Sequence, residues 1–169
     1  NTIADGTAVK TVGEQIFPYV QQNVDQVVTV EDDEIVTTFL DMVENHKMVA
    51  ENSGLLSVAA AQKLDFLKGK RVVCVISGGN MDVITMSSVI QNGLILRDRV
   101  FTISVLLPDR PGQLAEITKV IAEQKGNVIK LEHNQFVSVN RNLAVELRVT
   151  MEAFGTDHKH QIIEELRKN

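Results

Sequence analysis

The sequence contains no tryptophan, a single cysteine and only three prolines in 169 residues. The lone cysteine, Cys74, cannot form a disulfide within the chain, which fits a reducing cytoplasm. No stretch approaches the ~18 consecutive apolar residues of a membrane span, so no membrane partner is expected. The net charge of -5 argues against a nucleic-acid partner, which selects for a basic surface. What remains is a globular protein whose hydrophobic content, 44%, is enough for one medium or two small domains.

The first half of the chain, residues 1–92, alternates helical and strand patterns. Helices are expected over residues 11–25, after the acidic run that starts at Glu31, and over about Gly54–Leu67. The short β-branched run Gln26–Val30 and the apolar run Arg71–Ile76 are typical of buried strands. This alternation predicts an α/β layer on a parallel sheet. Two strands cannot bury the faces of such a sheet. The chain also opens on Asn1 without signal-peptide features, so we interpret this half as part of a larger domain.

The pattern changes after Asn92–Arg99, which we take as the boundary between two domains. Residues 100–107 alternate as a strand and lead into a turn at Pro108–Gly112. The periodic apolar residues that follow predict an amphipathic helix, with Pro111 at its first position and Gly126 just beyond its end. The second domain is therefore expected to open with a strand and a helix.

Two more strands and a helix are expected after this. Residues 128–137 form the second predicted strand, and Asp157 can cap a final helix. The third strand alternates most cleanly, and its buried face is predicted to carry Leu143, Val145, Leu147, Val149 and Met151. The order βαββα predicts a two-layer sandwich. Such a sandwich normally closes with a fourth strand, which these residues lack.

The strongest local motif is Ser77-Gly78-Gly79-Asn80, which lies between a predicted strand and a helix that begins near Met81. Ligands of open α/β sheets bind beyond the carboxyl ends of the strands, and glycines let the backbone approach a ligand closely. Backbone N–H groups at a helix start favour an anion or a ring acceptor. An ordinary turn explains the same residues, so the motif alone leaves a ligand site and a simple turn both open.

Three segments together carry a family resemblance. TIADGTAVK (Thr2–Lys10), VAENSG (Val49–Gly54) and VISGGNMD (Val75–Asp82) occur in the order found in the serine/threonine dehydratase and serine racemase family of fold-type-II pyridoxal-phosphate enzymes. Residues 1–92 resemble this family, although Leu55 stands where it usually has a smaller residue. The resemblance implies that the Schiff-base lysine, the glycine-rich phosphate loop and a divalent-cation site precede Asn1. The isolated chain is therefore expected to be inactive.

The resemblance also implies a cofactor site for pyridoxal phosphate. In the family, the serine that matches Ser77 hydrogen-bonds the pyridine nitrogen, and the residues that match Gly6 and Glu51 lie beside the ring. A neutral hydroxyl leaves that nitrogen largely unprotonated, which suits β-elimination of water better than transamination. The residues expected at the cofactor are Ser77, Gly6, Glu51, Gly78 and Asn80.

The second half of the chain resembles a different family. The motif LLPDRPGQL (Leu106–Leu114) and the element order of residues 99–169 resemble an ACT domain, a small regulatory βαββαβ module. ACT domains commonly pair and bind an amino acid between the first loop of one copy and the second strand of the other. A purely structural role for the loop, as a helix cap, is the alternative. The implied effector contacts are Asp109, Arg110, Pro111, Gly112, Gln113, Asn127, Val128 and Ile129.

Other candidate sites are weak. His133, His158 and His160 have no carboxylate or cysteine at ligand spacing, so no metal site is expected. A mononucleotide site at residues 77–80 would need a further phosphate loop, and the sequence has none.

The fold class expected is therefore α/β. Residues 1–95 are predicted to be part of a fold-type-II pyridoxal-phosphate domain, and residues 99–169 an α+β ACT domain without its last strand. The resemblance implies the C-terminal part of a threonine dehydratase (threonine ammonia-lyase) of isoleucine biosynthesis, with threonine as substrate and isoleucine or valine as effector. A homodimer or homotetramer is expected. The alternative is a stand-alone ACT module that binds an amino acid without catalysis.

Overall fold

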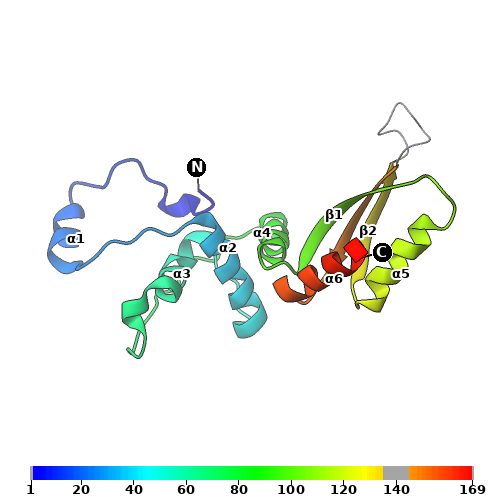
Figure 1. The fold of residues 1–169 in the computed structure, drawn as a ribbon. Helices are drawn as coiled ribbons and strands as arrows, with labels where there is room; N and C mark the ends of the chain where they lie inside the picture. Colours follow the sequence, from blue (N-terminus) through cyan, green and yellow to red (C-terminus); the bar gives the residue numbers. More distant parts are fainter. Residues whose placement is uncertain (1, 135–144, 169) are drawn as a thin grey trace. The chain divides into compact units, whose positions relative to one another are not determined.

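The computed structural model describes residues 2–134 and 145–168, and the chain separates into two compact units, residues 1–93 and 94–169 (Figure 1). The N-terminal unit consists of short helices joined by irregular segments. Its elements are η1 (Asp5–Thr7), α1 (Phe17–Asn23), α2 (Asp32–Asp41), the π turn η2 (Met42–His46), η3 (Asn52–Leu55), α3 (Leu56–Lys63), η4 (Asp65–Leu67) and most of α4 (Val83–Leu96).

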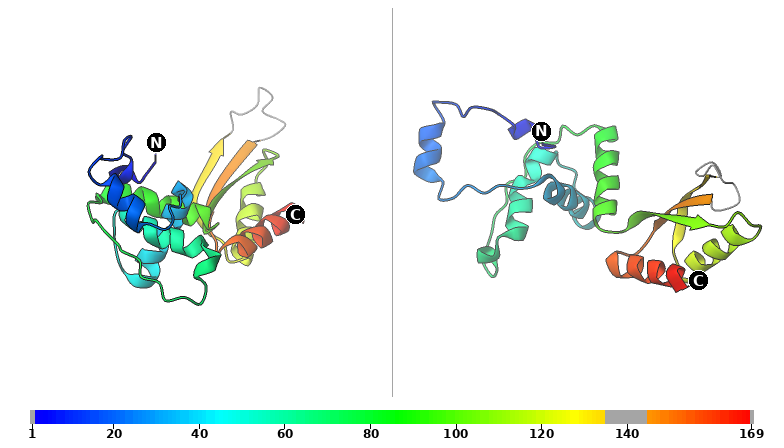
Figure 2. Two further views of the ribbon diagram at one scale, coloured as in Figure 1. Left: turned by 90° about the vertical axis from the view of Figure 1, so that its left-hand side faces the viewer. Right: turned by 45° about the horizontal axis from the view of Figure 1, so that its top comes forward.

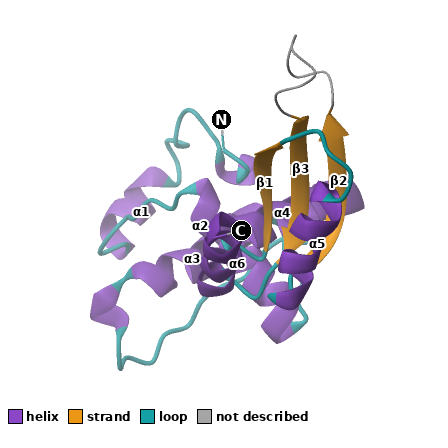
Figure 3. Cartoon of the chain, turned by 45° about the vertical axis from the view of Figure 1, so that its right-hand side comes forward, coloured by secondary structure: helices purple, strands orange, loops and turns teal. Residues whose placement is uncertain are grey.

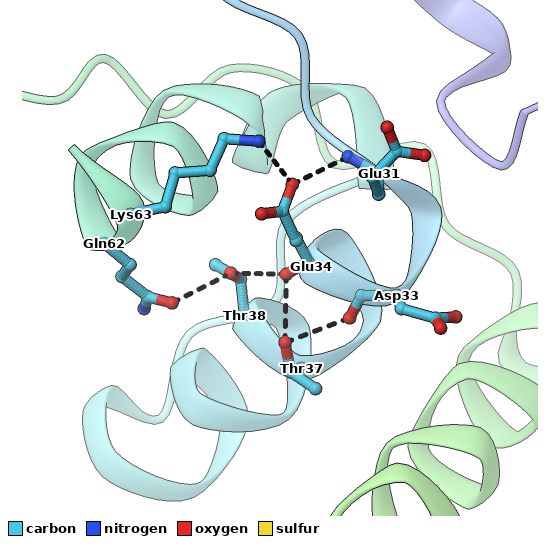
Figure 4. A network of polar contacts seen from close by, with 7 residues as sticks. All are labelled: Glu31, Asp33, Glu34, Thr37, Thr38, Gln62 and Lys63. Carbon is cyan, nitrogen blue, oxygen red and sulfur yellow. Dashed lines mark hydrogen bonds and ion pairs between the residues drawn. The ribbon is translucent and has the colours of Figure 1, made fainter.

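The start of α2 is fixed by a capping box. The Glu31 side chain accepts the N–H of Glu34, and the Glu34 carboxylate accepts the N–H of Glu31 at 2.8 Å. The same carboxylate forms an ion pair of 2.7 Å with Lys63 of α3 (Figure 4). The fully buried Thr38 hydroxyl donates to the Glu34 carbonyl oxygen at 2.7 Å, so it carries no unsatisfied donor into the core. This network joins α2 to α3 and confirms the helix predicted after the acidic run.

The core of the N-terminal unit lies between α2, η3 and α4. Phe39 and Leu55 are fully buried at its centre, and Val89 of α4 packs into the same cluster. Gly93 lets α4 approach α2, because a Cβ there would lie 3.2 Å from Cβ of Leu40. Apolar residues on these helices therefore form a core without any sheet.

Neither predicted strand of the N-terminal unit forms. Residues 26–30 and 71–76 have no regular secondary structure, and Val73 is 92% exposed. A parallel strand needs hydrogen-bonding neighbours, which the described residues of this unit do not provide. Ser57 instead donates to the Val75 carbonyl oxygen at 2.7 Å, which holds the second segment beside α3. Both segments have the apolar pattern of buried strands. A strand forms only where neighbouring strands offer hydrogen-bonding partners, and a local sequence pattern does not show whether such neighbours exist.

One helix is shorter than predicted, and another extends into the segment predicted to be the domain boundary. The helix predicted over residues 11–25 is only α1, and Pro18 lies in its first turn, where a missing N–H does no harm. Helix α4 continues to Leu96 and thus through most of the segment expected to be a boundary. The two compact units divide between Gly93 and Leu94, within that segment.

The C-terminal unit is a two-layer α+β sandwich. Its sheet is antiparallel with strand order β1-β3-β2 (Figure 3), and helices α5 and α6 cover one face (Figure 2). The order leaves β1 and β2 as the edges of the described sheet. The elements are β1 (Val100–Leu107), α5 (Gln113–Glu123), β2 (Asn127–Asn134), β3 (Val145–Glu152) and α6 (Thr156–Lys168).

Strand β3 alternates as predicted. Its buried residues face Ile117 and Ile121 of α5 and Ile162 of α6 in one hydrophobic cluster. Leu143 and the end of the predicted second strand, residues 135–137, lie outside the described residues. The buried face of β3 carries Val145, Leu147, Val149 and Met151.

Two details at the ends of α5 correct the sequence analysis. Pro111 is not the first helical residue, because Gly112 is the N-cap, with φ of 98°. At the other end the left-handed residue is Lys125, with φ of 63°, rather than Gly126. Gly126 is needed for space instead, since a Cβ there would lie 2.8 Å from Cγ2 of Ile121.

Candidate cofactor and effector sites

Residues of the three motif segments converge on one cavity of the N-terminal unit. This cavity has a volume of about 390 Å³, and polar atoms form most of its wall. Its lining residues are Ile3, Asp5, Gly6, Glu51, Asn52, Asn80, Met81, Asp82 and Thr85. The fold therefore brings together segments that are far apart in the sequence.

Glu51 organises the loop Ser77–Asn80. Its Oε2 accepts the backbone N–H of Asn80 at 3.2 Å, and its own N–H donates to the Gly78 carbonyl oxygen at 3.5 Å. Gly78 has φ of 72°, and a Cβ on it would lie 2.1 Å from Cδ of Glu51. Only glycine combines this backbone conformation with this contact. The carboxylate of Glu51 thus fixes the loop at the mouth of the cavity.

Two further glycines allow close approach at the same place. A Cβ on Gly54 would lie 1.6 Å from the Ser77 carbonyl oxygen, and a Cβ on Gly6 would lie 3.0 Å from Oγ of Ser53. Gly54 thus meets the backbone of Ser77, and Gly6 meets the side chains of Ser53 and Glu51. Gly6 and Glu51 both line the cavity beside these contacts.

Asn52 joins the first segment to the second. Its side chain is 8% exposed, and its Nδ2 donates to the Ile3 carbonyl oxygen at 3.1 Å. Within the described residues, Oδ1 of Asn52 and Oγ of Ser53 are buried without a hydrogen-bond partner. An unsatisfied buried polar group costs about 1–3 kcal/mol, so these atoms favour a bound polar group nearby. A flat polar cofactor ring fits this site. The glycines allow it to approach the backbone closely, and the Glu51 carboxylate and the unpartnered atoms of Asn52 and Ser53 offer it polar contacts.

Asp82 lines the cavity and directly precedes α4. Its carboxylate accepts hydrogen bonds from the Thr85 hydroxyl, from the Thr85 N–H at 3.0 Å and from the Ile84 N–H at 2.9 Å. These bonds, with that from the Thr85 hydroxyl foremost, hold the pKa of Asp82 below its usual value. Asp82 is therefore a helix cap in a position that faces the cavity.

The predicted cofactor residues divide into two groups. Gly6, Glu51 and Asn80 line the cavity, while Ser77 and Gly78 flank it through contacts with Gly54 and Glu51. Their roles toward a cofactor remain predictions.

Six of the nine lining residues were not predicted: Ile3, Asp5, Asn52, Met81, Asp82 and Thr85. Asp82 carried a usable signal, because an aspartate directly before a helical run is a typical N-cap. Asn52 carried none, since its importance depends on contacts with a segment 49 positions away.

A second cavity, of about 310 Å³, lies beside the first loop of the C-terminal unit. It includes all five predicted loop residues from Asp109 to Gln113, together with Leu107, Pro108, Leu114, His133, Val145 and Leu147. The predicted contacts on β2, residues 127–129, do not line it. The β2 residue that lines this cavity is His133, which the sequence offered only as a weak candidate for metal binding.

The sheet register explains why the two halves of the predicted effector site do not meet. Leu107 lies opposite Val145, and Asn127 lies opposite Glu152, seven residues farther along β3. At roughly 3.3 Å per residue the two places are about 23 Å apart. Ile129 falls at a bulge of β2 and is half exposed, whereas Val128 packs against the core.

Residues 2–134 and 145–168 contain neither a cluster of metal ligands nor a membrane-spanning helix. No group of three or more histidine, cysteine, aspartate or glutamate side chains there is arranged to hold a metal ion. No helix in that part of the chain is both long and apolar enough to cross a membrane.

Comparison with known proteins gives two family matches. Residues 1–78 match the family described as pyridoxal-phosphate dependent enzyme, and residues 101–169 match the ACT domain. Similar curated proteins include the L-threonine ammonia-lyase of Geobacter sulfurreducens, 36% identical over 98% of this chain and 42% of its own length. The enzyme of that name from Thermotoga maritima is 39% identical over 99% of this chain and 41% of its own length.

A third relative is the L-threonine dehydratase biosynthetic IlvA of Staphylococcus aureus, 34% identical over 83% of this chain and 34% of its own length. The chain thus spans less than half the length of the curated relatives it matches. These matches confirm both resemblances and the expected fold class. The chain is thus similar to pyridoxal-phosphate-dependent enzymes over residues 1–78 and to ACT domains over residues 101–169.

Proposed function

We propose that the protein to which these residues belong is a threonine ammonia-lyase, which converts L-threonine to 2-oxobutanoate and ammonia. The observation that carries this proposal is identity of 36% and 39% to two L-threonine ammonia-lyases over 98% and 99% of the chain. That similarity runs through both units rather than through the ACT domain alone. It therefore favours an enzyme over a stand-alone amino-acid sensor.

The cavity in the N-terminal unit is the proposed contact surface for pyridoxal phosphate. This cofactor, when bound, withdraws electrons from the α-carbon of an amino acid. Gly6 and Glu51 border the space for its ring, and the Ser77 hydroxyl is proposed to donate to the ring nitrogen. Glu51 also fixes the backbone of Gly78 and Asn80, so it would hold Ser77 in place. A neutral serine there favours elimination over transamination.

The ACT domain is proposed to bind isoleucine or valine between two copies of the chain. One copy cannot supply both halves of the predicted site, because the loop at Asp109–Gln113 and the strand start at Asn127–Ile129 lie at opposite ends of the sheet. Pairing along an exposed β2 edge would bring the loop of one copy to the strand of another. We therefore propose a homodimer, or a homotetramer built from such pairs, in the cytoplasm.

The test is an assay of the complete protein with pyridoxal phosphate. We expect 2-oxobutanoate from threonine, a slower reaction with serine, and a change of rate with isoleucine or valine. The isolated chain of 169 residues should show none of this activity. Binding of isoleucine by a complete protein that does not consume threonine would instead support the alternative, a sensor without catalysis.

A further inference from the structure

The first described segment of the chain, Thr2–Gly6, forms one wall of the proposed cofactor cavity. Ile3, Asp5 and Gly6 all line this cavity. The segment has no regular secondary structure before the short turn η1, so no ladder of backbone hydrogen bonds fixes its course. The contacts that place this wall therefore come from side chains elsewhere in the N-terminal unit.

Two side chains bind both polar groups of the Ile3 backbone. The Ile3 N–H donates to Oδ1 and Oδ2 of Asp32, at 3.3 Å to each, and Nδ2 of Asn52 donates to the Ile3 carbonyl oxygen at 3.1 Å. Asp32 lies in the first turn of α2, and Asn52 is the first residue of η3. We call this pair of side chains, Asp32 and Asn52, the Ile3 clamp.

Thr2 adds a second contact on the Asp32 side of the clamp. Its hydroxyl donates to Oδ1 of Asp32 and accepts the Ala4 N–H at 3.2 Å. A hydrogen bond to a carboxylate is stronger than one between two neutral groups. Ala4 is buried, so this bond reaches from the start of α2 to a residue in the interior of the unit. Asp32 thus holds two consecutive residues of the segment, Thr2 and Ile3.

The position of Ile3 determines where Gly6 lies. The Ala4 carbonyl oxygen accepts the Thr7 N–H at 3.1 Å and the Thr7 hydroxyl at 2.9 Å, so Gly6 is held in a tight turn directly after the clamped residue. A Cβ on Gly6 would lie 3.6 Å from Oε1 of Glu51. A shift of Ile3 therefore changes the contact of Gly6 with Glu51 and, with it, the shape of the cavity.

We infer that Asp32 is a positioning residue for the threonine ammonia-lyase reaction, which acts through Thr2 and Ile3 to place Gly6 beside the cofactor ring. This inference rests on the proposed function, since it assumes that pyridoxal phosphate occupies the cavity. Asp32 does not line the cavity, so its effect on the cofactor is indirect. Loss of its carboxylate removes one half of the clamp and leaves the Ile3 N–H and the Thr2 hydroxyl without this acceptor.

The experiment uses the complete holoenzyme and two pairs of variants. Asp32→Ala removes the carboxylate, and Asp33→Ala is its matched control, because Asp33 is an exposed carboxylate in the same first turn of α2 and takes no part in the clamp. Thr2→Val removes the hydroxyl at similar size, whereas Thr2→Ser keeps it. For each variant, absorbance and fluorescence of the bound cofactor report the surroundings of the ring. The threonine assay gives the rate per bound cofactor, and urea unfolding gives the stability.

In Asp32→Ala and Thr2→Val, the cofactor spectrum should change and the rate per bound cofactor should fall about 10-fold or more, the scale expected for losing a hydrogen bond to a charged group. Thr2→Ser and Asp33→Ala should keep the spectrum and the rate of the wild type. A merely structural role of Asp32 would instead lower the stability while the spectrum and the rate per bound cofactor stay unchanged.

A wild-type spectrum and rate in Asp32→Ala overturn the inference alone, and so do equal changes in Asp33→Ala, because the charge at the helix start would then be the cause. If Asp32→Ala does not fold, the comparison of Thr2→Val with Thr2→Ser decides in the same way. A complete wild-type protein that binds no pyridoxal phosphate or consumes no threonine refutes the proposed function and, with it, the inference.

Discussion

The carbonyl oxygen of Ser77 occupies the space in which a side chain on Gly54 would begin, 1.6 Å from the position of its Cβ. No side chain can enter this contact, and the obstacle is backbone rather than a flexible group. The relationship ties the proposed cofactor loop to the turn that precedes α3. It also makes Gly54 the most direct test of the way in which the cavity is assembled.

Replacing Gly54 with alanine should displace the loop Ser77–Asn80 and destabilise the N-terminal unit. We expect a loss of about 1–3 kcal/mol or more, the usual cost of forcing an extra methyl group into a packed site. Denaturant unfolding of the chain measures this loss. Gly79→Ala is the control, since a Cβ on Gly79 meets nothing within 4 Å. Equal stability of the two variants would show that the contact between Gly54 and Ser77 does not exist in solution.

Replacing Ser77 with alanine in the complete enzyme should lower the rate of threonine turnover about 2- to 10-fold, as expected for the loss of one hydrogen bond of about 0.5–1.5 kcal/mol. The covalent attachment of the cofactor should persist, because Ser77 does not form that bond. Ser77→Asp should shift the visible absorbance and favour side reactions. Ser87→Ala, on the exposed face of α4, is the control. Unchanged rates and spectra in both Ser77 variants would refute its proposed role.

The ion pair between Glu34 and Lys63 should make the stability of the N-terminal unit depend on pH. The hydrogen bond from Lys63, with that from the Glu31 N–H, holds the pKa of Glu34 below its usual value. A carboxyl group with a lowered pKa in the folded state stabilises the fold above its unfolded pKa. That contribution disappears as the pH falls through the folded pKa.

Glu34→Gln should therefore be less stable than the wild type at pH 7. The difference should shrink once the pH falls below the ordinary glutamate pKa of about 4.3, and should vanish below the lowered pKa of the folded state. Urea unfolding at a series of pH values measures this. Asp65→Asn is the control, because the pair between Asp65 and Lys68 is 82–87% exposed and should contribute little. A difference that stays constant from pH 7 to pH 3 would rule out the ionic contribution.

Replacing Leu147 with alanine should strongly destabilise the C-terminal unit. Leu147 is fully buried at the centre of β3, and truncation of such a residue costs about 2–5 kcal/mol. Arg148→Ala is the control, because Arg148 lies on the open face of the sheet and its side chain is 55% exposed. Thermal unfolding and hydrogen exchange along residues 145–151 measure both. Rapid exchange throughout this strand in the wild type would contradict the ACT sandwich.

Replacing Gly112 with aspartate should abolish effector binding. A carboxylate at the start of α5 would lie where the backbone N–H groups are proposed to receive the carboxylate of the effector. Gly112→Ala is the matched control, because it introduces the same strain at φ of 98° without a charge. Calorimetry with isoleucine and valine distinguishes them. Equal affinity of the aspartate and alanine variants would show that the effector carboxylate binds elsewhere.

The sequence by itself determined the local features. The acidic run after Gln26–Val30 predicted the start of α2, and the alternation in β3 predicted its buried face, because capping and period-two burial depend on neighbours along the chain. The order of motifs also identified both families before any contact was known. Each of these properties depends on residues that are close together in the sequence, and the structure and the comparisons confirm them.

Only the tertiary structure decided how those segments meet. It left Arg71–Ile76 without a sheet, because a parallel strand requires partners that a local pattern cannot reveal. It continued α4 through the expected boundary and gave Asp98 its partners on α6, 58 and 61 residues away in the sequence. It also placed Asn52 in the cavity and separated the loop at Gly112 from the start of β2. Each of these outcomes depends on contacts between residues distant along the chain, and that is the physical reason why only the folded protein shows them.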